Sequence, residues 1–225
     1  VCYFSTFQLD LDGAIMVTGS HNPPEYNGFK VSLGKTTIFG EEIQALKAIL
    51  QSANFISGNG SVKNYDIFPE YLERYKKEFG QIKPIKIVLD CGNGAGGSIV
   101  RKLFNAAGLA PDILFEEPDG LFPNHHPDPT VEENLKDLRK KVLETGAICG
   151  IGFDGDADRI GVVDHTGKML YGDELMTIFA RDILAQNKGA KIVGDVKCSD
   201  RMYHDIAKNS GEPIMWKTGH SLIKE

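Results

Sequence analysis

Asp154, Asp156 and Asp158 alternate in the stretch "GFDGDADRIG", and Arg159 follows directly. Alternate side chains of an extended loop point the same way, so these carboxylates converge and repel one another unless a cation lies between them. Ligands that are all oxygens suit a hard ion, Mg²⁺ or Ca²⁺, and a neighbouring arginine commonly holds phosphate. An EF-hand is excluded because its sixth position, normally Gly, is Arg159 and its twelfth, normally Glu, is His165. The competing interpretation is an exposed acidic turn.

A glycine-rich turn in "DCGNGAGGS" offers a second candidate site. Gly92, Gly94 and Gly97 match G-x-G-x-x-G between an expected strand and an expected helix. Glu116 follows about twenty residues on, as a dinucleotide-binding site requires. The alternative is a tight strand-to-helix turn, in which glycine supplies positive φ and close packing. The residues alone leave both interpretations open.

Ser20 and His21 lie in the stretch "VTGSHNPPEYNGFK". A serine in such a context is most simply a turn residue. A hydrolase nucleophile would be expected in G-x-S-x-G, which is absent, and a histidine adjacent in sequence is not thereby placed to take the serine proton. Ser20 could instead accept a phosphoryl group.

Several further polar residues are weaker candidates. Lys197, Lys217 and His220 follow expected strands, where open α/β sheets bind ligands. Each of them taken alone is more simply a surface residue. His125 and His126 in "FPNHHPDP" resemble metal ligands, but the flanking prolines favour an ordered structural loop.

Strands that alternate with helices must position these residues. The expected helices cover residues 40–53, 68–82, 98–108, 130–146, 173–187 and 199–211. The expected strands cover 13–20 (buried), 28–33, 85–90, 111–117, 147–154 and 190–196, with a hairpin over 159–172. This order predicts the α/β class, with mixed, mostly parallel sheets flanked by helices in repeated domains. Domain boundaries are expected near residues 82 and 188, which gives 1–82, 83–188 and 189–225.

Composition narrows the possible functions. The chain of 225 residues is 41% apolar and 25% charged, and its net charge of −6 argues against binding nucleic acid or an anionic membrane. The cysteines are far apart, which favours reduced thiols in a cytoplasmic protein. No run approaches the roughly 18 apolar residues of a membrane span. The first residue, Val1, and the final "TGHSLIKE" suggest a piece of a longer protein.

Taken together, the motifs resemble the α-D-phosphohexomutase family, within it the bacterial phosphomannomutase/phosphoglucomutase branch. They are "TGSHNPPEYNGFK", "DGLFPNHHPDPTVEENLKDL", "GFDGDADRIGVV", "GDVKCS" and "MWKTGHSLIK". The resemblance implies the later part of domain 1, all of domain 2 and the start of domain 3 of a four-domain enzyme. Such an enzyme moves phosphate reversibly between the 1- and 6-positions of a hexose phosphate through a hexose 1,6-bisphosphate. The resemblance also implies that this piece is inactive alone.

The resemblance assigns a role to each candidate. Ser20 would be the phosphoserine, and Asp154, Asp156 and Asp158 would hold Mg²⁺ together with an oxygen of its phosphate. Arg159 would contact that phosphate.

The remaining roles concern protons and substrate. Lys30, with His21 nearby, would assist proton transfer, and we expect neighbouring groups to lower the pKa of this lysine. Lys197 and His220 would contact the sugar phosphate.

The resemblance reduces Gly92–Gly97 to a structural turn. Alternatives are a nucleotide-binding oxidoreductase module built on that turn, and a metal-binding scaffold without turnover. The preferred sugar and the oligomeric state stay open.

Overall fold

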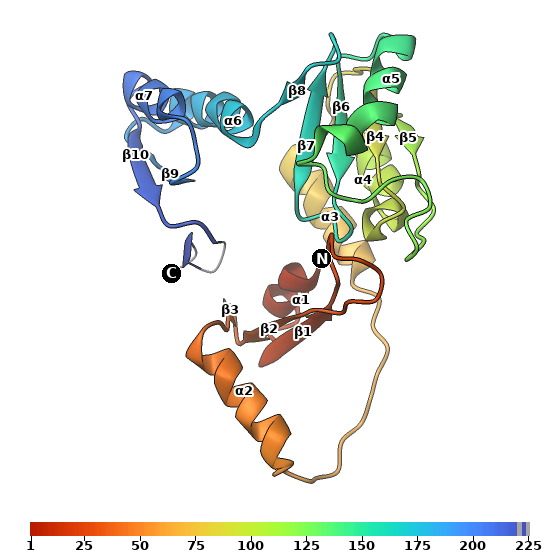
Figure 1. Ribbon diagram of the computed structural model, residues 1–225, viewed down its shortest axis with the longest axis vertical. Helices are drawn as coiled ribbons and strands as arrows, with labels where there is room; N and C mark the ends of the chain where they lie inside the picture. Colours follow the sequence, from red (N-terminus) through yellow and green to blue (C-terminus); the bar gives the residue numbers. More distant parts are fainter. Residues whose placement is uncertain (220–221, 224–225) are drawn as a thin grey trace.

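The computed structural model describes residues 1–219 and 222–223, whose strands form three sheets (Figure 1). The first unit carries a small antiparallel sheet in the order β1-β2-β3. Its elements are α1 (Cys2–Gln8), β1 (Gly13–Val17), β2 (Phe29–Leu33), β3 (Thr36–Thr37) and α2 (Glu41–Ser52). The register sets Met16 of β1 opposite Lys30 of β2, so Lys30 belongs to a strand rather than to a loop.

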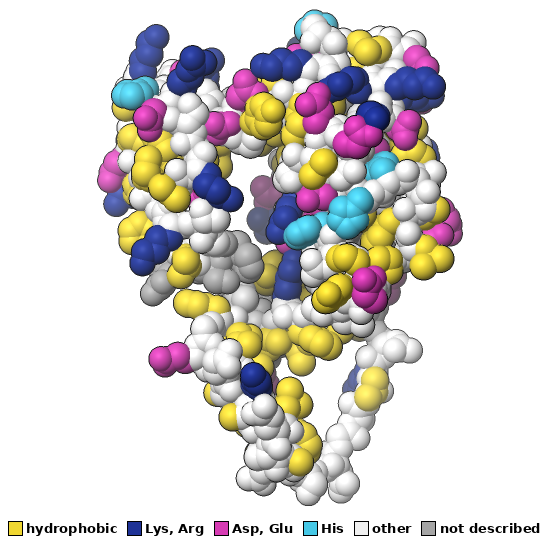
Figure 2. Space-filling model, in the orientation of Figure 1, with side chains coloured by type: hydrophobic (Ala, Val, Ile, Leu, Met, Phe, Trp, Pro, Cys, Tyr) yellow, Lys and Arg dark blue, Asp and Glu magenta, His cyan; other side chains and the backbone are white. Residues whose placement is uncertain are grey.

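The burial expected for β1 is wrong. Ile15 and Val17 are 67% and 63% exposed. Their strand pairs with β2 and lies at the edge of the described sheet, so the apolar sequence forms a strand without being covered on that face. Space-filling atoms in Figure 2 show apolar side chains across this lower part of the molecule.

The second unit contains the largest described sheet, in the order β5-β4-β6-β7-β8. Its elements are α3 (Phe68–Phe79), β4 (Ile87–Asp90), η1 (Ala95–Ser98), α4 (Val100–Ala106), β5 (Asp112–Leu114), η2 (Glu132–Leu135), α5 (Lys136–Thr145), β6 (Cys149–Phe153), β7 (Ile160–Asp164) and β8 (Met169–Leu170). The helix expected over 130–146 is divided into the 3₁₀ turn η2 and helix α5.

Every residue of β4 is buried, and burial on both faces explains its apolar run Ile87–Leu89, which ends at Asp90. On one face, Val88 packs in a cluster with Leu138 and Val142 of α5. On the other, Leu89 packs in a cluster with Val100 of α4. This sandwiched strand runs parallel to β5 and β6, so the carboxyl ends of all three open on one edge, where the loops that carry the candidate site begin.

The third unit is a two-stranded parallel sheet flanked by helices. Its elements are α6 (Gly172–Gln186), β9 (Lys191–Asp195), α7 (Asp200–Lys208) and β10 (Glu212–Trp216). Ala180 and Leu184 of α6 share a buried cluster with Met202 and Ile206 of α7. The domain boundaries expected near residues 82 and 188 stay predictions, and this packing favours placing the second one before α6.

The α/β class with mixed sheets is confirmed. Parallel pairs are fewer than expected: three of the seven pairings between described strands are parallel and four are antiparallel. The antiparallel pairs come from chain reversals that join neighbouring strands, such as the expected hairpin of β7 and β8. Over the described ranges, none of the helices has the length and apolar character needed to cross a membrane.

Candidate active site

The acidic loop connects the antiparallel strands β6 and β7, and it is held by its own first aspartate. Asp154 is fully buried, and its Oδ1 accepts hydrogen bonds from the backbone N of Asp158 at 3.0 Å and of Arg159 at 3.1 Å. Ala157 turns the loop with a φ of 56°. Oδ1 of Asp154 thus shapes the loop, and Oδ2 is left to accept a hydrogen bond from outside it.

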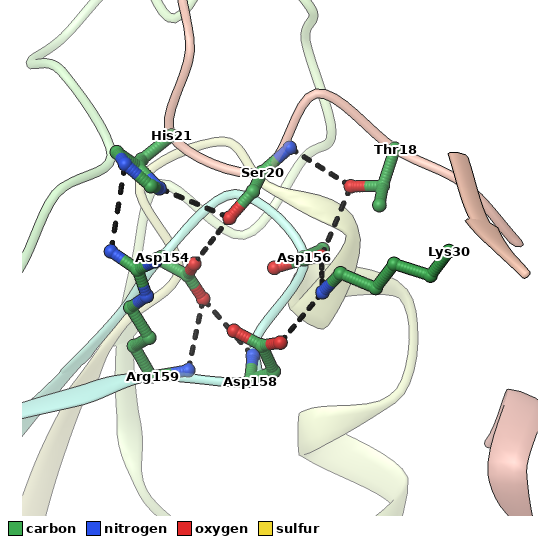
Figure 3. A network of polar contacts seen from close by, with 8 residues as sticks. All are labelled: Thr18, Ser20, His21, Lys30, Asp154, Asp156, Asp158 and Arg159. Atoms are coloured by element: carbon green, nitrogen blue, oxygen red, sulfur yellow. Dashed lines mark hydrogen bonds and ion pairs between the residues drawn. The ribbon is translucent and has the colours of Figure 1, made fainter. Parts of the chain in front are cut away.

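Ser20 meets this loop from the first unit, 134 residues earlier in the sequence (Figure 3). Its Oγ donates to Oδ2 of Asp154 at 2.8 Å. The backbone has a φ of 52°, a left-handed conformation that is costly for serine and concentrates at functional sites. The backbone N of Ser20 donates to Oγ1 of Thr18 at 2.9 Å, and that contact holds the turn.

The two loops touch closely through Gly155. A Cβ atom at this position would lie 2.0 Å from the carbonyl oxygen of Ser20, so only glycine permits the approach. The serine turn therefore rests directly on the backbone of the acidic loop.

Lys30 of β2 faces the other two aspartates. Its Nζ lies 2.7 Å from Oδ2 of Asp156 and 2.6 Å from Oδ2 of Asp158. Burial lowers the pKa of Lys30, but the hydrogen bonds and charges of the two carboxylates outweigh this, so its pKa is raised. The lowered pKa expected from the sequence is wrong for this arrangement, in which Lys30 is held as a cation.

The three carboxylates have the character of a cation site. One oxygen from each of Asp154, Asp156 and Asp158 lies within 4.8 Å of the others. Among the described residues, Oδ1 of Asp156 is buried without a hydrogen-bond partner, which is costly for an anionic oxygen unless a cation reaches it. Burial raises the pKa of Asp154, whereas contacts with Lys30 overcome burial and lower the pKa of Asp156. This all-oxygen donor set fits Mg²⁺.

His21 and Arg159 close the opposite side of the serine. Nδ1 of His21 lies 3.1 Å from Oγ of Ser20, and its Nε2 lies 3.5 Å from a guanidinium nitrogen of Arg159. The hydroxyl of Ser20 donates its hydrogen bond to Asp154, and Arg159 can only donate. The tautomer of His21 that fits both neighbours therefore carries its proton on Nδ1 and accepts at Nε2. In this state His21 donates toward Ser20 rather than acting as its base.

Thr18 is a member of the network that sequence reasoning missed. Its hydroxyl accepts from the backbone of Ser20 and donates to Oδ2 of Asp156 at 3.1 Å. The available signal was its place two residues before the serine, where threonine hydroxyls often bond to the backbone of a turn.

Some predicted residues lie outside this network. Lys197 is an exposed residue after β9, 3.9 Å from a carboxylate oxygen of Asp195, and lines a groove of about 450 Å³ beside Tyr171. Figure 2 shows a hollow between this part of the molecule and the second unit, with Lys, Arg and His side chains along its rim. Lys217 follows β10 and is exposed, and His220 lies outside the described residues. His125 and His126 belong to an ordered loop beneath the site, in which His125 pairs with Asp90.

The glycine turn does not have the features of a nucleotide site. Glu116, which would have to hold a ribose, forms two hydrogen bonds with Arg101. Gly97 packs on the carbonyl of Glu116, where a Cβ atom would overlap at 1.7 Å. The last glycine of the motif, Gly97, lies within the short 3₁₀ turn η1 and not at the α-helix N-terminus that binds pyrophosphate. These contacts favour the structural interpretation.

Comparisons with known proteins match nearly the whole chain to one family of enzymes. The family models for phosphoglucomutase/phosphomannomutase alpha/beta/alpha domains I, II and III match residues 1–57, 69–167 and 171–225. A phosphomannomutase/phosphoglucomutase of Pseudomonas aeruginosa is 47% identical over all 225 residues, which cover 49% of that protein. A phosphoglucomutase of Neisseria gonorrhoeae is 45% identical over 99% of the chain and 49% of its own length.

A solved structure shows the same arrangement. The crystal structure of a phosphoglucomutase/phosphomannomutase family protein from Burkholderia thailandensis superimposes with a TM-score of 0.91 at 46% identity, and covers 95% of this chain and 47% of that one. The chain thus spans about half the length of the relatives it matches. From its motifs, its fold and these matches, the chain belongs to the phosphoglucomutase/phosphomannomutase family.

Proposed function

We propose that this chain is the phosphoryl-carrying part of a phosphohexomutase, which moves phosphate reversibly between the 1- and 6-positions of glucose or mannose phosphates. The observation that carries the proposal is the 2.8 Å contact between Oγ of Ser20 and Asp154, at the rim of three converging carboxylates. The three carboxylates beside this hydroxyl repel one another, and a cation bound between them would also attract a phosphoryl group carried on Ser20.

In the proposed site, Asp154, Asp156 and Asp158 would hold Mg²⁺ together with a phosphate oxygen on Ser20. Bound there, the ion would neutralise charge on the phosphoryl group and orient it. Arg159 would contact the same phosphate from the side of His21, because a guanidinium matches phosphate geometry.

The bond changes balance without an external phosphate donor. The phosphorus–oxygen bond to Oγ of Ser20 breaks as a bond to a hydroxyl oxygen of the sugar monophosphate forms, which gives a hexose 1,6-bisphosphate. The other phosphoryl group of this intermediate then returns to Oγ, leaving the isomeric monophosphate. Such transfers depend mainly on positioning and charge neutralisation, and both are supplied by fixed groups around Ser20.

Proton transfer is proposed for Lys30, with His21 nearby. The sugar hydroxyl that attacks the phosphoryl group must lose a proton, and the sugar oxygen that is released in the returning step must gain one. Lys30 is the candidate general acid, because its carboxylate partners keep it protonated. It can act as a base once those carboxylates are engaged elsewhere. His21 would orient the phosphate on Ser20 through its Nδ1 hydrogen.

Lys197, which lines the groove beside Tyr171, and His220 would hold the sugar phosphate itself. Because the chain covers about half of its relatives' length, we propose that turnover requires the remaining half and that this chain alone binds metal without completing the cycle. A cytoplasmic location stays a prediction; the four cysteines are free in the structure.

The test is phosphorylation of Ser20 in the full-length protein incubated with glucose 1,6-bisphosphate and Mg²⁺. Peptide mass spectrometry should find one phosphoryl group on the peptide that contains Ser20, and coupled assays should detect mutase activity. Ser20→Ala should lose both, whereas Ser52→Ala, at an exposed position of α2, should keep both. Full mutase activity in Ser20→Ala would overturn the proposal.

A further inference from the structure

A buried ion pair lies beneath the acidic loop and takes no part in the proposed chemistry. Asp90, at the carboxyl end of β4, is 1% exposed. Nε2 of His125 lies 3.2 Å from its Oδ1 and 3.1 Å from its Oδ2, and the backbone N of Gly92 donates to Oδ1 at 2.9 Å. A carboxylate this deeply buried is stable only when paired and hydrogen-bonded, so His125 is its necessary counter-charge.

His125 is held in one orientation and in one charge state. Its Nδ1 faces the carbonyl oxygen of His126 at 3.0 Å. A ring with acceptors at both nitrogens must donate from both, which defines the imidazolium. Burial lowers the pKa of His125, but hydrogen bonds to Asp90 and His126 and the charges of Asp90 and Asp137 raise it more, so the net shift is upward. The Phe115 ring packs edge-on at 5.3 Å.

The loop that His125 fixes supports the acidic loop from below. Pro127, two residues on, is buried, and its Cγ would lie 3.6 Å from a Cβ atom on Gly155. Its Cβ would lie 3.2 Å from a Cβ atom on Gly92. Pro127 therefore fills the space between the glycine turn and the loop on which Ser20 rests.

The glycine turn supports the same residue from a second direction. The backbone N of Ala95 donates to the carbonyl oxygen of Gly155 at 2.9 Å. A Cβ atom on Gly94 would lie 2.8 Å from that oxygen, so the approach depends on glycine. Asp90 begins this turn and His125 begins the other support, which means that their ion pair joins both supports of Gly155.

We propose that His125 is a positioning residue of the phosphoryl-transfer site: its ion pair with Asp90 fixes the acidic loop against Ser20. The inference rests on the proposed function, since it assigns a purpose to the support of that site. His125 acts through Pro127 and Gly155, and the described contacts place it away from the reacting atoms. It also gives the "FPNHHPDP" motif and the glycine turn a common role.

Mn²⁺ binding to the full-length protein, followed by electron paramagnetic resonance of the free ion, tests this role without relying on activity. His125→Gln removes the charge and should weaken Mn²⁺ binding about 10- to 100-fold, the usual effect of losing a residue that orients a metal site. The rate of Ser20 phosphorylation by glucose 1,6-bisphosphate should fall with it. The matched control is His126→Gln, an exposed neighbour, which should leave both quantities unchanged.

Two further variants separate positioning from general stability. Pro127→Ala removes the Cγ atom that faces Gly155 but keeps the Asp90–His125 pair, so it tests the same role if His125→Gln does not fold. It should also weaken Mn²⁺ binding. Val142→Ala opens a cavity at the far end of β6, where Val142 packs on Gly150. It should lower the melting temperature without changing the Mn²⁺ affinity of the folded protein.

The outcomes distinguish this inference from the proposed function. If Asp154→Asn abolishes Mn²⁺ binding while folded His125→Gln and Pro127→Ala bind like the unmodified protein, the positioning role is refuted and the proposed function stands. If Asp154→Asn leaves Mn²⁺ binding intact, the metal site itself is wrong and the proposed function fails first. Equal weakening by His126→Gln would also refute a role specific to the buried pair.

Discussion

Replacing Lys30 with methionine is expected to strengthen divalent metal binding. The Lys30 ammonium lies 2.7 Å from Oδ2 of Asp156 and 2.6 Å from Oδ2 of Asp158, so it already contacts the carboxylates that a metal would need. Methionine keeps an unbranched apolar side chain of similar reach and removes the charge. The internal competitor is lost while the strand β2 is preserved.

The size of the effect follows from the burial of the two partners. The Asp156 side chain is 4% exposed, and a charge-assisted hydrogen bond to such a group contributes about 1.5–3 kcal/mol. The Asp158 side chain is 53% exposed, and solvent screening reduces that contact to about 0.2–1 kcal/mol. A metal that displaces the ammonium must break both contacts, mainly the first. Their removal should favour binding by about 2 kcal/mol, roughly 30-fold in the dissociation constant.

Isothermal titration with Mg²⁺ at fixed ionic strength and pH measures the change. Lys35→Met is the matched control, because Lys35, in the turn between β2 and β3, forms an exposed ion pair with Asp10 at 3.5 Å. Its metal affinity should equal that of the unmodified chain. Binding by Lys30→Met that is unchanged or weaker would refute the competition between the lysine and the metal.

Three further results are expected. Gly155→Ala places a methyl group 2.0 Å from the carbonyl of Ser20, so it should lower the free energy of unfolding in urea by about 1–3 kcal/mol; an unchanged midpoint would contradict the contact. Cys91 is buried and its pKa is raised to about 12, so iodoacetamide at about pH 8 should label it only after denaturation, and rapid labelling of the native chain would count against its burial. The raised pKa of His125 contributes stability that is complete below its unfolded value of 6.5 and is lost as pH rises through the folded value. The stability difference between the unmodified chain and His125→Gln should therefore shrink with rising pH in denaturant titrations, and a constant difference would exclude that linkage.

The sequence alone was enough to predict several local features of the site. The sequence predicted that Asp154, Asp156 and Asp158 converge, and the structure brings one oxygen of each within 4.8 Å. The loop that carries them is a tight turn and not the expected extended segment, because the backbone N of Ala157 donates to the carbonyl oxygen of Asp154 at 3.0 Å. Apolar periodicity likewise predicted helices at α2 and α3, since their spacing depends on residues a few positions apart. These features are local, and local patterns are readable in a single sequence.

The exposure of β1 and α2 could not be predicted from the sequence. The faces of β1 and α2 carry the apolar residues expected of a core, yet Ile15 and Leu50 are each 67% exposed. Apolar spacing determines which face would be buried, but what covers that face depends on other segments.

Tertiary structure alone decided how the parts of the site meet. The local sequence left Ser20 either a turn residue or a phosphoryl acceptor, and the fold brings it to 2.8 Å from Asp154 across 134 positions. It also reverses the expected pKa shift of Lys30, because the sign depends on whether burial or the neighbouring carboxylates dominate. The glycine turn, which matched a nucleotide motif, instead supports Gly155. Residue types determine what chemistry is available, while distances and burial, which are set by packing between distant segments, determine which of it the site can perform.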